Sequence, residues 1–191
     1  MATAVSICSN ALLKLGSRAI SSLTDGTDMA TLCANIYPEA RDSLLRNHLW
    51  NFAIKRTQLA AEATTPSWGY SYQHVLPGDF IRLLEVEDEF DYTIEAGRIL
   101  CDFTPLNIMY VYRNENVSMY DTMFVELLTQ KMIAELAYAV TRSDSKAQAE
   151  MTKYAAMAKY ARNIDSTEAP YPSFQDFPLL SSRFGNQYGD Y

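Results

Sequence analysis

Apolar residues recur at the spacing of an α-helix in four stretches of the chain, which predicts four helices. The expected helices cover residues 3–15, a segment capped by Asp28, residues 119–142 and residues 144–164. Their apolar stripes are Val5, Cys8, Leu12 and Leu15; Met29, Cys33, Ile36, Ala40 and Leu44; Phe124, Leu128, Met132 and Leu136; and Ala147, Met151, Tyr154, Ala158 and Ala161. Gly16 favours the end of the first helix, and Pro38 predicts a kink or a break in the second.

Between the second and third helices the apolar period changes to that of a strand. Residues 52–59 and 106–112 alternate apolar and polar side chains, and further short runs of this kind lie between them. Ala96-Gly97 suits a hairpin turn. We therefore expect four or five short strands in one small antiparallel sheet.

This order of elements predicts an α+β fold, mainly a helical bundle of about four helices with a small antiparallel β insertion and an extended C-terminal tail. The bundle is expected to consist of residues 1–50 and 119–168, and the β-rich insertion of residues 51–118.

Residues 169–191 form the tail, which has three prolines, no lysine and no apolar periodicity. It also carries six aromatic residues, a kind of residue that disordered segments usually lack. We therefore expect an extended docking arm that lies against another protein or a neighbouring subunit. The expected anchors are Phe174, Phe177, Leu179, Leu180, Arg183 and Phe184. A tail that folds back on its own bundle is the alternative.

Residues 37–56 begin with helical spacing and end with strand-like alternation, so they mark a joint between helix and sheet. The charged residues of this segment are spaced for i,i+3 and i,i+4 ion pairs on an exposed helix face: Glu39, Arg41, Asp42 and Arg46. Trp50 and Phe52 are expected to anchor the chain at the joint.

Charge and cysteine content narrow the class of protein. The formal net charge of −7 argues against a protein that grips nucleic acid by its phosphates. Cys8, Cys33 and Cys101 are sparse and odd in number, which indicates buried thiols in a reducing compartment. There is no signal-peptide pattern and no apolar run of membrane-spanning length, so we expect a soluble chain made in a cytoplasm, with no membrane contact.

Candidate chemistry is sparse. His48 and His74 lack a second ligand at metal-site spacing, and each is expected at the edge of an element. There is no glycine-rich phosphate loop and no nucleophile elbow. The acidic run at 85–95 contains carboxylates of the kind a glycan hydrolase needs, but a solvated strand edge is the favoured interpretation. The sequence thus predicts no catalytic, cofactor-binding or metal-binding residue.

Three blocks of sequence carry a resemblance to a known family. In chain order they are ICSNALLKLG, ANIYPEARDSLLRNHLWNFAIKR and GYSYQHVLPGDFIRLLEVED, and the later EAGRILCD and FVELLTQKMIAELAYAVT are consistent with them. This order resembles the head–tail adaptor proteins of tailed phages, and in particular the tail tubular protein A family of short-tailed phages. The resemblance covers nearly the whole chain, and the block ending in NHLWNFAIKR is its most distinctive part.

The resemblance implies a structural virion protein at the head–tail junction, made in the cytoplasm of the host bacterium. Such adaptors form a ring, usually of twelve copies, between the portal protein and the tail nozzle or next tail ring. Genomic DNA passes through the centre without specific binding. No enzymatic activity and no cofactor are implied. Two other classes stay open: a tail-associated peptidoglycan hydrolase, and a monomeric helical scaffold or regulator.

Overall fold

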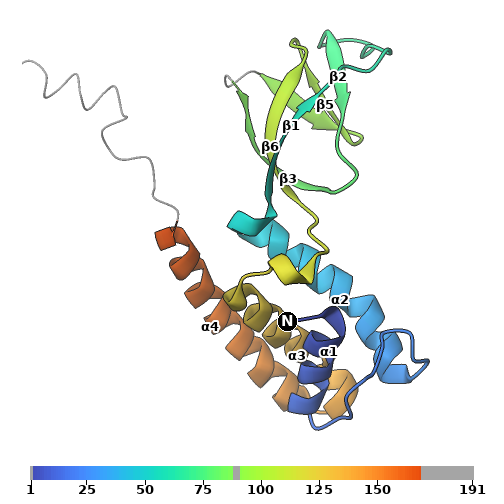
Figure 1. Ribbon diagram of the computed structural model, residues 1–191, viewed down its shortest axis with the longest axis vertical. Coiled ribbons are helices and arrows are strands. Elements are labelled where there is room, and N and C mark those ends of the chain that lie inside the picture. Colours follow the sequence, from blue (N-terminus) through green and yellow to red (C-terminus); the bar gives the residue numbers. More distant parts are fainter. Residues whose placement is uncertain (1, 88–90, 169–191) are drawn as a thin grey trace, which may run out of the picture.

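Helices and strands occupy opposite ends of the molecule (Figure 1). The computed structural model describes residues 2–87 and 91–168, with side chains up to residue 161. The helices in this part are α1 (Ala4–Lys14), α2 (Asp28–Asn47), α3 (Thr122–Thr141) and α4 (Asp144–Glu168). The strands are β1 (Ile54–Leu59), β2 (Tyr72–Val75), β3 (Phe80–Val86), β4 (Tyr92–Glu95), β5 (Arg98–Cys101) and β6 (Leu106–Tyr112). The predicted α+β class, with four helices and small antiparallel sheets, is confirmed.

Local sequence signals set the ends of α1. The Thr3 side chain accepts from the backbone N–H of Ser6, and the Ser6 hydroxyl accepts from Thr3 in return, which forms a capping box. Gly16 follows the helix with a φ of +83°, a conformation that glycine adopts without a steric penalty. The helix therefore ends where the sequence predicted.

The course of α2 tests the prediction at two points. Thr27 rather than Asp28 is the N-cap, and its hydroxyl accepts from the N–H of Ala30. The helix also continues through Pro38, which rules out the break, one of the two outcomes predicted there. Proline removes only one backbone donor, and buried Tyr37 and Ala40 beside it hold both halves of the helix against the core.

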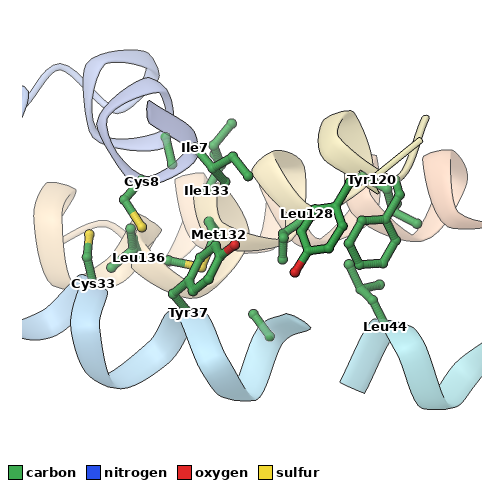
Figure 2. Packing of buried hydrophobic residues seen from close by; sticks show 14 of the residues in the cluster. Ile7, Cys8, Cys33, Tyr37, Leu44, Tyr120, Leu128, Met132, Ile133 and Leu136 are labelled. Carbon is green, nitrogen blue, oxygen red and sulfur yellow. The ribbon is translucent and has the colours of Figure 1, made fainter. Parts of the chain in front are cut away.

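The central element of the bundle is α3, which contacts the other three helices. Its predicted stripe is completely buried, because Phe124, Leu128, Met132 and Leu136 are each 0% exposed. Further buried residues widen this stripe around the helix: Leu127, Thr129, Ile133, Ala134 and Ala137. A helix that is apolar on most sides belongs in a core rather than at a surface. Figure 2 shows how part of this helix packs between α1 and α2.

Two cysteines face each other in the same core. Cys8 on α1 and Cys33 on α2 are both fully buried and unoxidised (Figure 2). Contact with the Cys33 thiol, together with burial, raises the pKa of Cys8 well above its ordinary value. The prediction of buried thiols is therefore confirmed for these two residues, and Cys101 in the sheets is also buried and free.

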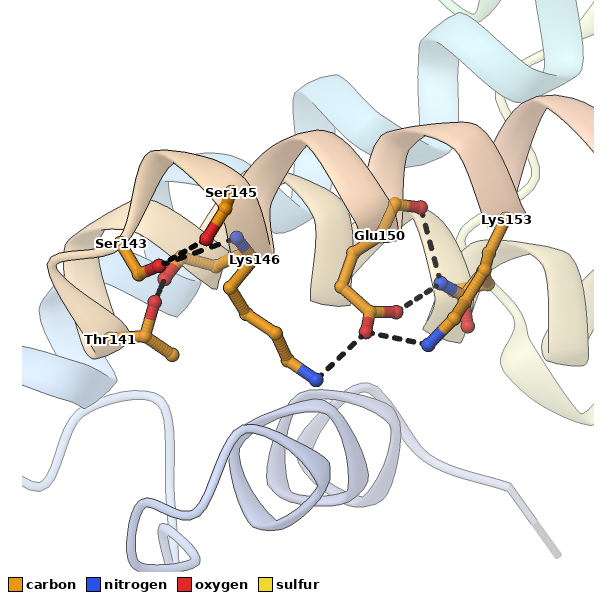
Figure 3. Close-up of polar contacts among 8 residues, drawn as sticks. Thr141, Ser143, Ser145, Lys146, Glu150 and Lys153 are labelled. Atoms are coloured by element: carbon orange, nitrogen blue, oxygen red, sulfur yellow. Dashed lines mark hydrogen bonds and ion pairs between the residues drawn. The ribbon is translucent and has the colours of Figure 1, made fainter.

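A buried carboxylate joins α3 to α4 (Figure 3). Glu150 is 5% exposed, accepts from Gln130 of α3 at 3.0 Å, and pairs with Lys153 and Lys146 at 2.8 and 3.1 Å. These donors, Lys153 foremost, hold the pKa of Glu150 at about 2. The predicted inward position of Met151 is wrong: this side chain is 43% exposed, and Glu150 takes the inward place.

The strands form two sheets instead of the single sheet predicted. Both are antiparallel and three-stranded, with the orders β1-β6-β3 and β2-β5-β4. Sequence alternation identifies strands but does not say which pairs with which, so the division was not accessible from the pattern. The β4–β5 hairpin is as expected, because Ala96 and Gly97 both have positive φ, at 45° and 76°.

The described residues form two buried clusters. The sheet core comprises Val86, Ile99, Cys101, Leu106, Ile108 and Tyr110. The bundle core unites side chains from the four helices, the joint and two strand residues, Ile81 and Val111. Leu106, Ile108 and Tyr110 of β6 thus face the sheet core, while Val111 faces the bundle core from the opposite side of the same strand. Strand β6 consequently links the two cores.

Candidate functional site

The joint between bundle and sheets is built around Trp50. The end of α2 leaves backbone carbonyls without helical partners. The indole N–H of Trp50 donates to one of them, the carbonyl of Leu44, at 3.2 Å. The Trp50 side chain is only 2% exposed. This residue therefore satisfies the helix terminus and fills the core beside it.

Aromatic rings surround Trp50 on the bundle side. The Trp50 and Phe124 rings meet edge-on with centroids 5.0 Å apart. Phe52 contacts Phe124 at 5.0 Å and Tyr120 at 5.4 Å. Such tilted and edge-on pairs add stabilisation beyond the area that they bury. Both residues that the sequence placed at the joint lie in this cluster.

The chain crosses between the two parts twice, and the two crossings are bonded to each other. The carbonyl of Phe52 accepts from the Asn114 side-chain amide at 3.2 Å and from the Tyr112 hydroxyl at 3.3 Å. On the returning segment the Tyr120 hydroxyl donates to the carbonyl of Asn114 at 2.7 Å. Bending at one crossing would break hydrogen bonds to the other, so these bonds restrain the joint.

Arg41 corrects the prediction for the charged residues of this segment. Its side chain is 8% exposed; Nε pairs with Asp42 at 2.8 Å and Nη2 with Glu115 at 3.3 Å. Arg113 also pairs with Asp42, at 2.7 Å. Exposed i,i+3 and i,i+4 ion pairs were predicted for this segment, and for Arg41 that prediction is wrong. Its second partner, Glu115, follows the last strand in sequence. Burial lowers the pKa of Arg41, but the bond and charge of Asp42 outweigh this and raise it.

Contacts from β3 complete the joint. Arg46 lies on the surface as predicted, and its Nη1 donates to the carbonyl of Ile81 at 2.7 Å. Arg82 donates to the carbonyl of Arg46 at 3.1 Å, which occupies another open carbonyl at the end of α2. The last turn of α2 is therefore held by side chains from two different segments.

Metal ligands and paired carboxylates are the two kinds of candidate chemistry to place in the structure. Among the described residues, no group of three His, Cys, Asp or Glu side chains is placed to hold a metal ion. Glu85 and Glu87 of the acidic run are exposed and lie beside a hollow of about 620 Å³ that Arg56 and Asn107 also line. The Glu87 carboxylate accepts from the Asn107 amide. Asp88 and Glu89 lie outside the described residues.

His74 lies near the end of β2, an edge strand, but it is buried inside the sheets. It is 0% exposed in β2, opposite Ile99 of β5, and neither ring nitrogen has a hydrogen-bond partner within the described structure. Burial lowers the pKa of this imidazole, and the charge of Glu62 offsets part of that effect. A neutral imidazole without a hydrogen-bond partner inside the sheets therefore makes the folded state less stable as the pH falls.

We expect the unfolding free energy to fall as the pH drops below about 6.5, the ordinary pKa of histidine. The folded state has the lower pKa at His74, so the unfolded chain takes up the proton first and gains stability. The His74 contribution is complete above that pH and is lost as the pH falls toward the folded pKa. Urea unfolding at several pH values between about 7 and 5 measures the slope. His74→Leu should flatten it; an equal slope in both proteins would contradict the role of His74.

A hollow at the far end of the molecule was missed by sequence reasoning. It lies on the outer face of the β2-β5-β4 sheet and has a volume of about 350 Å³. Its lining includes Pro66, Trp68, Tyr70, Gln73, Glu95 and Arg98. Trp68 is 86% exposed, the highest value among the large apolar residues described. The sequence signal was a tryptophan within a loop of turn-forming residues, Thr65-Pro66-Ser67-Trp68-Gly69.

The predicted docking anchors cannot be placed, because Phe174, Phe177, Leu179, Leu180, Arg183 and Phe184 lie outside the described residues. None of the helices in the described ranges is long and apolar enough to cross a membrane. The chain matches no protein-family model, and a search of curated proteins finds no match.

Proposed function

We propose that this protein is a structural head–tail connector of a tailed phage, a ring of twelve copies between the portal protein and the tail nozzle or next tail ring. The supporting observation is the joint. The most distinctive block of the family resemblance, residues 37–56, supplies Arg41, Trp50 and Phe52, and these hold the bundle and the sheets together. A protein that connects two different bodies needs two contact regions in a fixed relation, and a doubly crossed joint provides that.

Charge supports the same role. A channel for DNA should lack a basic lining, since contacts between phosphates and cations would retard passage of the genome. The net charge of −7 fits a protein that DNA passes without specific binding. In this role the chain has no catalytic residue and no cofactor, and its place is the head–tail junction of the virion.

The purified chain should be largely monomeric and should assemble only on the portal. The sequence has no long heptad repeat that would drive constitutive association. Sedimentation velocity measures the free protein, and co-sedimentation with tailless, portal-bearing heads of the phage that encodes it measures assembly. We expect a single slow species alone and ring-bearing heads in the mixture. A stable ring without any portal would overturn assembly on the template, and absence from the heads would overturn the connector proposal.

Deleting residues 170–191 provides the matched variant for the head-binding measurement. Every described residue of both buried clusters is retained in this variant, so we expect it to keep the wild-type circular dichroism spectrum and melting temperature. It should nevertheless fail to join the heads. Full joining by the deletion variant would refute the docking arm.

The hollow beside Glu85 and Glu87 keeps the peptidoglycan hydrolase as the second candidate. The same protein preparation distinguishes the two through the rate at which it clears a suspension of bacterial cell walls. Clearing that is lost in both Glu85→Gln and Glu87→Gln, with no binding to heads, would favour the hydrolase. A monomer with neither activity would favour the helical scaffold or regulator.

A further inference from the structure

The hollow around Trp68 lies on the face of the second sheet that points away from the sheet core. Gln73 and Glu95 pair in register with Leu100 and Arg98 of β5, so these side chains share one face. His74 and Ile99 pair on the opposite face and are buried. The loop before β2 and the outer face of the sheet line the hollow. Figure 1 shows β2 and β5 at the end of the molecule remote from the bundle.

The walls of the hollow are fixed by bonds between side chains. Arg98 donates to both carboxylate oxygens of Glu62, at 2.6 and 3.3 Å. The backbone N–H and the hydroxyl of Ser71 both donate to Asp102, at 2.8 and 2.9 Å. The Tyr70 hydroxyl lies 3.0 Å from that of Thr93 on β4. Because the loop is tied at both ends, a ligand would bind without first ordering it.

Trp68 is held outward at the rim. Gly69 follows it with a φ of +90°, a conformation that a side chain at this position would strain. An indole that is 86% exposed contributes almost nothing to the core of its own chain. Tryptophan, tyrosine and arginine are the residues that most often dominate binding surfaces. Grooves lined by aromatic side chains bind proline-rich, extended segments, whose preset backbone loses little entropy on binding.

The chain itself contains a segment with this chemistry. Residues 170–178 read Pro-Tyr-Pro-Ser-Phe-Gln-Asp-Phe-Pro, with three prolines and three aromatic residues within one short stretch. They follow the end of α4 almost directly, and Figure 1 shows this end on the side of the bundle nearest the sheets. An extended segment of this length spans about 30 Å, enough to cross from one subunit to the next.

We propose that the Trp68 hollow binds residues 170–178 of a neighbouring copy of this chain. The proposal rests on the connector function above, because it is the ring that brings a second copy into reach. The prolines and aromatic rings of the segment stack on Trp68 and Tyr70. The side chains of Gln73 and Glu95 form hydrogen bonds with its backbone. Leu179, Leu180, Arg183 and Phe184 then lie beyond the hollow, available for the portal. Residues 170–178 of each subunit would thus bind that subunit to its neighbour.

The experiment uses the full-length chain and a synthetic peptide of residues 169–191. The chain has two tryptophans, and Trp50 is buried while Trp68 is exposed, so changes in accessibility report on Trp68. In dilute protein, acrylamide should quench Trp68 freely. Added peptide should shift the emission to shorter wavelength and protect Trp68 from quenching in a saturable way. A peptide of the same composition in scrambled order should do neither.

Substitutions locate the site through anisotropy of a fluorescein-labelled peptide. Trp68→Ala should weaken binding at least about tenfold, as expected for the central residue of a contact. The matched control is Tyr160→Ala, which removes another exposed aromatic ring, 61% exposed on α4, and should leave affinity unchanged. Both side chains are largely exposed, so both variants should keep the wild-type melting temperature.

Three results would overturn the proposal. The first is no binding of the peptide, or binding that Trp68→Ala leaves unchanged. The second is a Trp68 that is already shielded in dilute protein and becomes exposed in Phe174→Ala, since the segment would then cover its own hollow. The third is protection by a soluble cell-wall oligosaccharide but not by the peptide, which would assign the hollow to a sugar. These measurements involve no heads, so their failure and a failure to join heads are separate outcomes.

Discussion

Replacing Trp50 with alanine is expected to lower the free energy of unfolding by about 3–5 kcal/mol. The side chain is 2% exposed, and its ring packs against Phe124 at the centre of the joint. Truncation removes this contact and leaves a cavity between bundle and sheets. It also leaves the carbonyl of Leu44 without the indole donor, at a position closed to water. Urea denaturation followed by circular dichroism measures the change.

Two variants separate the contributions of Trp50. Trp50→Phe keeps an aromatic ring in the core but loses the bond to Leu44, so it should cost less than the alanine variant. Leu49→Ala changes the adjacent side chain, which is 40% exposed, and should shift stability by no more than about 1 kcal/mol. If Trp50→Ala leaves the denaturation midpoint unchanged, Trp50 does not pin the joint.

Local patterns in the sequence predicted the elements of this fold well. The helical stripe of Phe124, Leu128, Met132 and Leu136 is buried throughout, and Ala96-Gly97 turns the β4–β5 hairpin. These features depend on neighbouring residues only. A helical period or a positive-φ turn is determined within a few positions, so one sequence is enough to reveal it.

Features that depend on distant partners were not predictable in this way. Arg41 has the spacing of a surface charge, but the chain returns through the sheets and brings Glu115 to its guanidinium. His74 looks polar in sequence, and only the pairing of β2 with β5 buries it. The division into two sheets has the same origin, because strand alternation does not encode which strands pair.

The Trp68 hollow shows a third kind of limit. Residues 65–69 signal a loop, and a tryptophan in a loop indicates a surface contact, but the opposite wall comes from β4 and β5. A binding surface that several segments share becomes visible only after folding. The joint could be predicted in part, since Trp50 and Phe52 lie at the change of apolar period. Its other members, Asn114, Glu115 and Tyr120, follow the last strand in sequence and reach the joint only when the chain folds.

The joint also connects two separately packed parts of the chain. The bundle core and the sheet core are separate clusters, and β6 contributes to both from its two faces. The segments before β1 and after β6 are bonded to each other at Phe52 and Asn114. Force applied to the sheets would therefore reach the bundle through two hydrogen-bonded crossings rather than one flexible link.

Replacing Arg41 with alanine is expected to lower the free energy of unfolding by about 2–3 kcal/mol, well above the cost of removing a surface charge. The guanidinium is nearly buried and contacts two carboxylates from different segments, Asp42 and Glu115. Without Arg41, Asp42 keeps only its ion pair with Arg113. The segment after β6 also loses the ion pair that Glu115 makes with α2. Urea denaturation is the measurement, since guanidinium chloride would screen the charges under study.

The matched control is Arg46→Ala, on the same helix, which should cost about 1 kcal/mol or less because this arginine is exposed. Arg41→Lys keeps the charge but cannot direct two separate donors at Asp42 and Glu115, so it should recover less than half of the loss. Added sodium chloride should reduce the Arg41→Ala difference in part, because the Glu115 side chain is 71% exposed and is screened by salt, whereas that of Asp42 is 28% exposed. Equal midpoints for Arg41→Ala and the wild-type chain would show that Arg41 is solvated and that the joint does not depend on it.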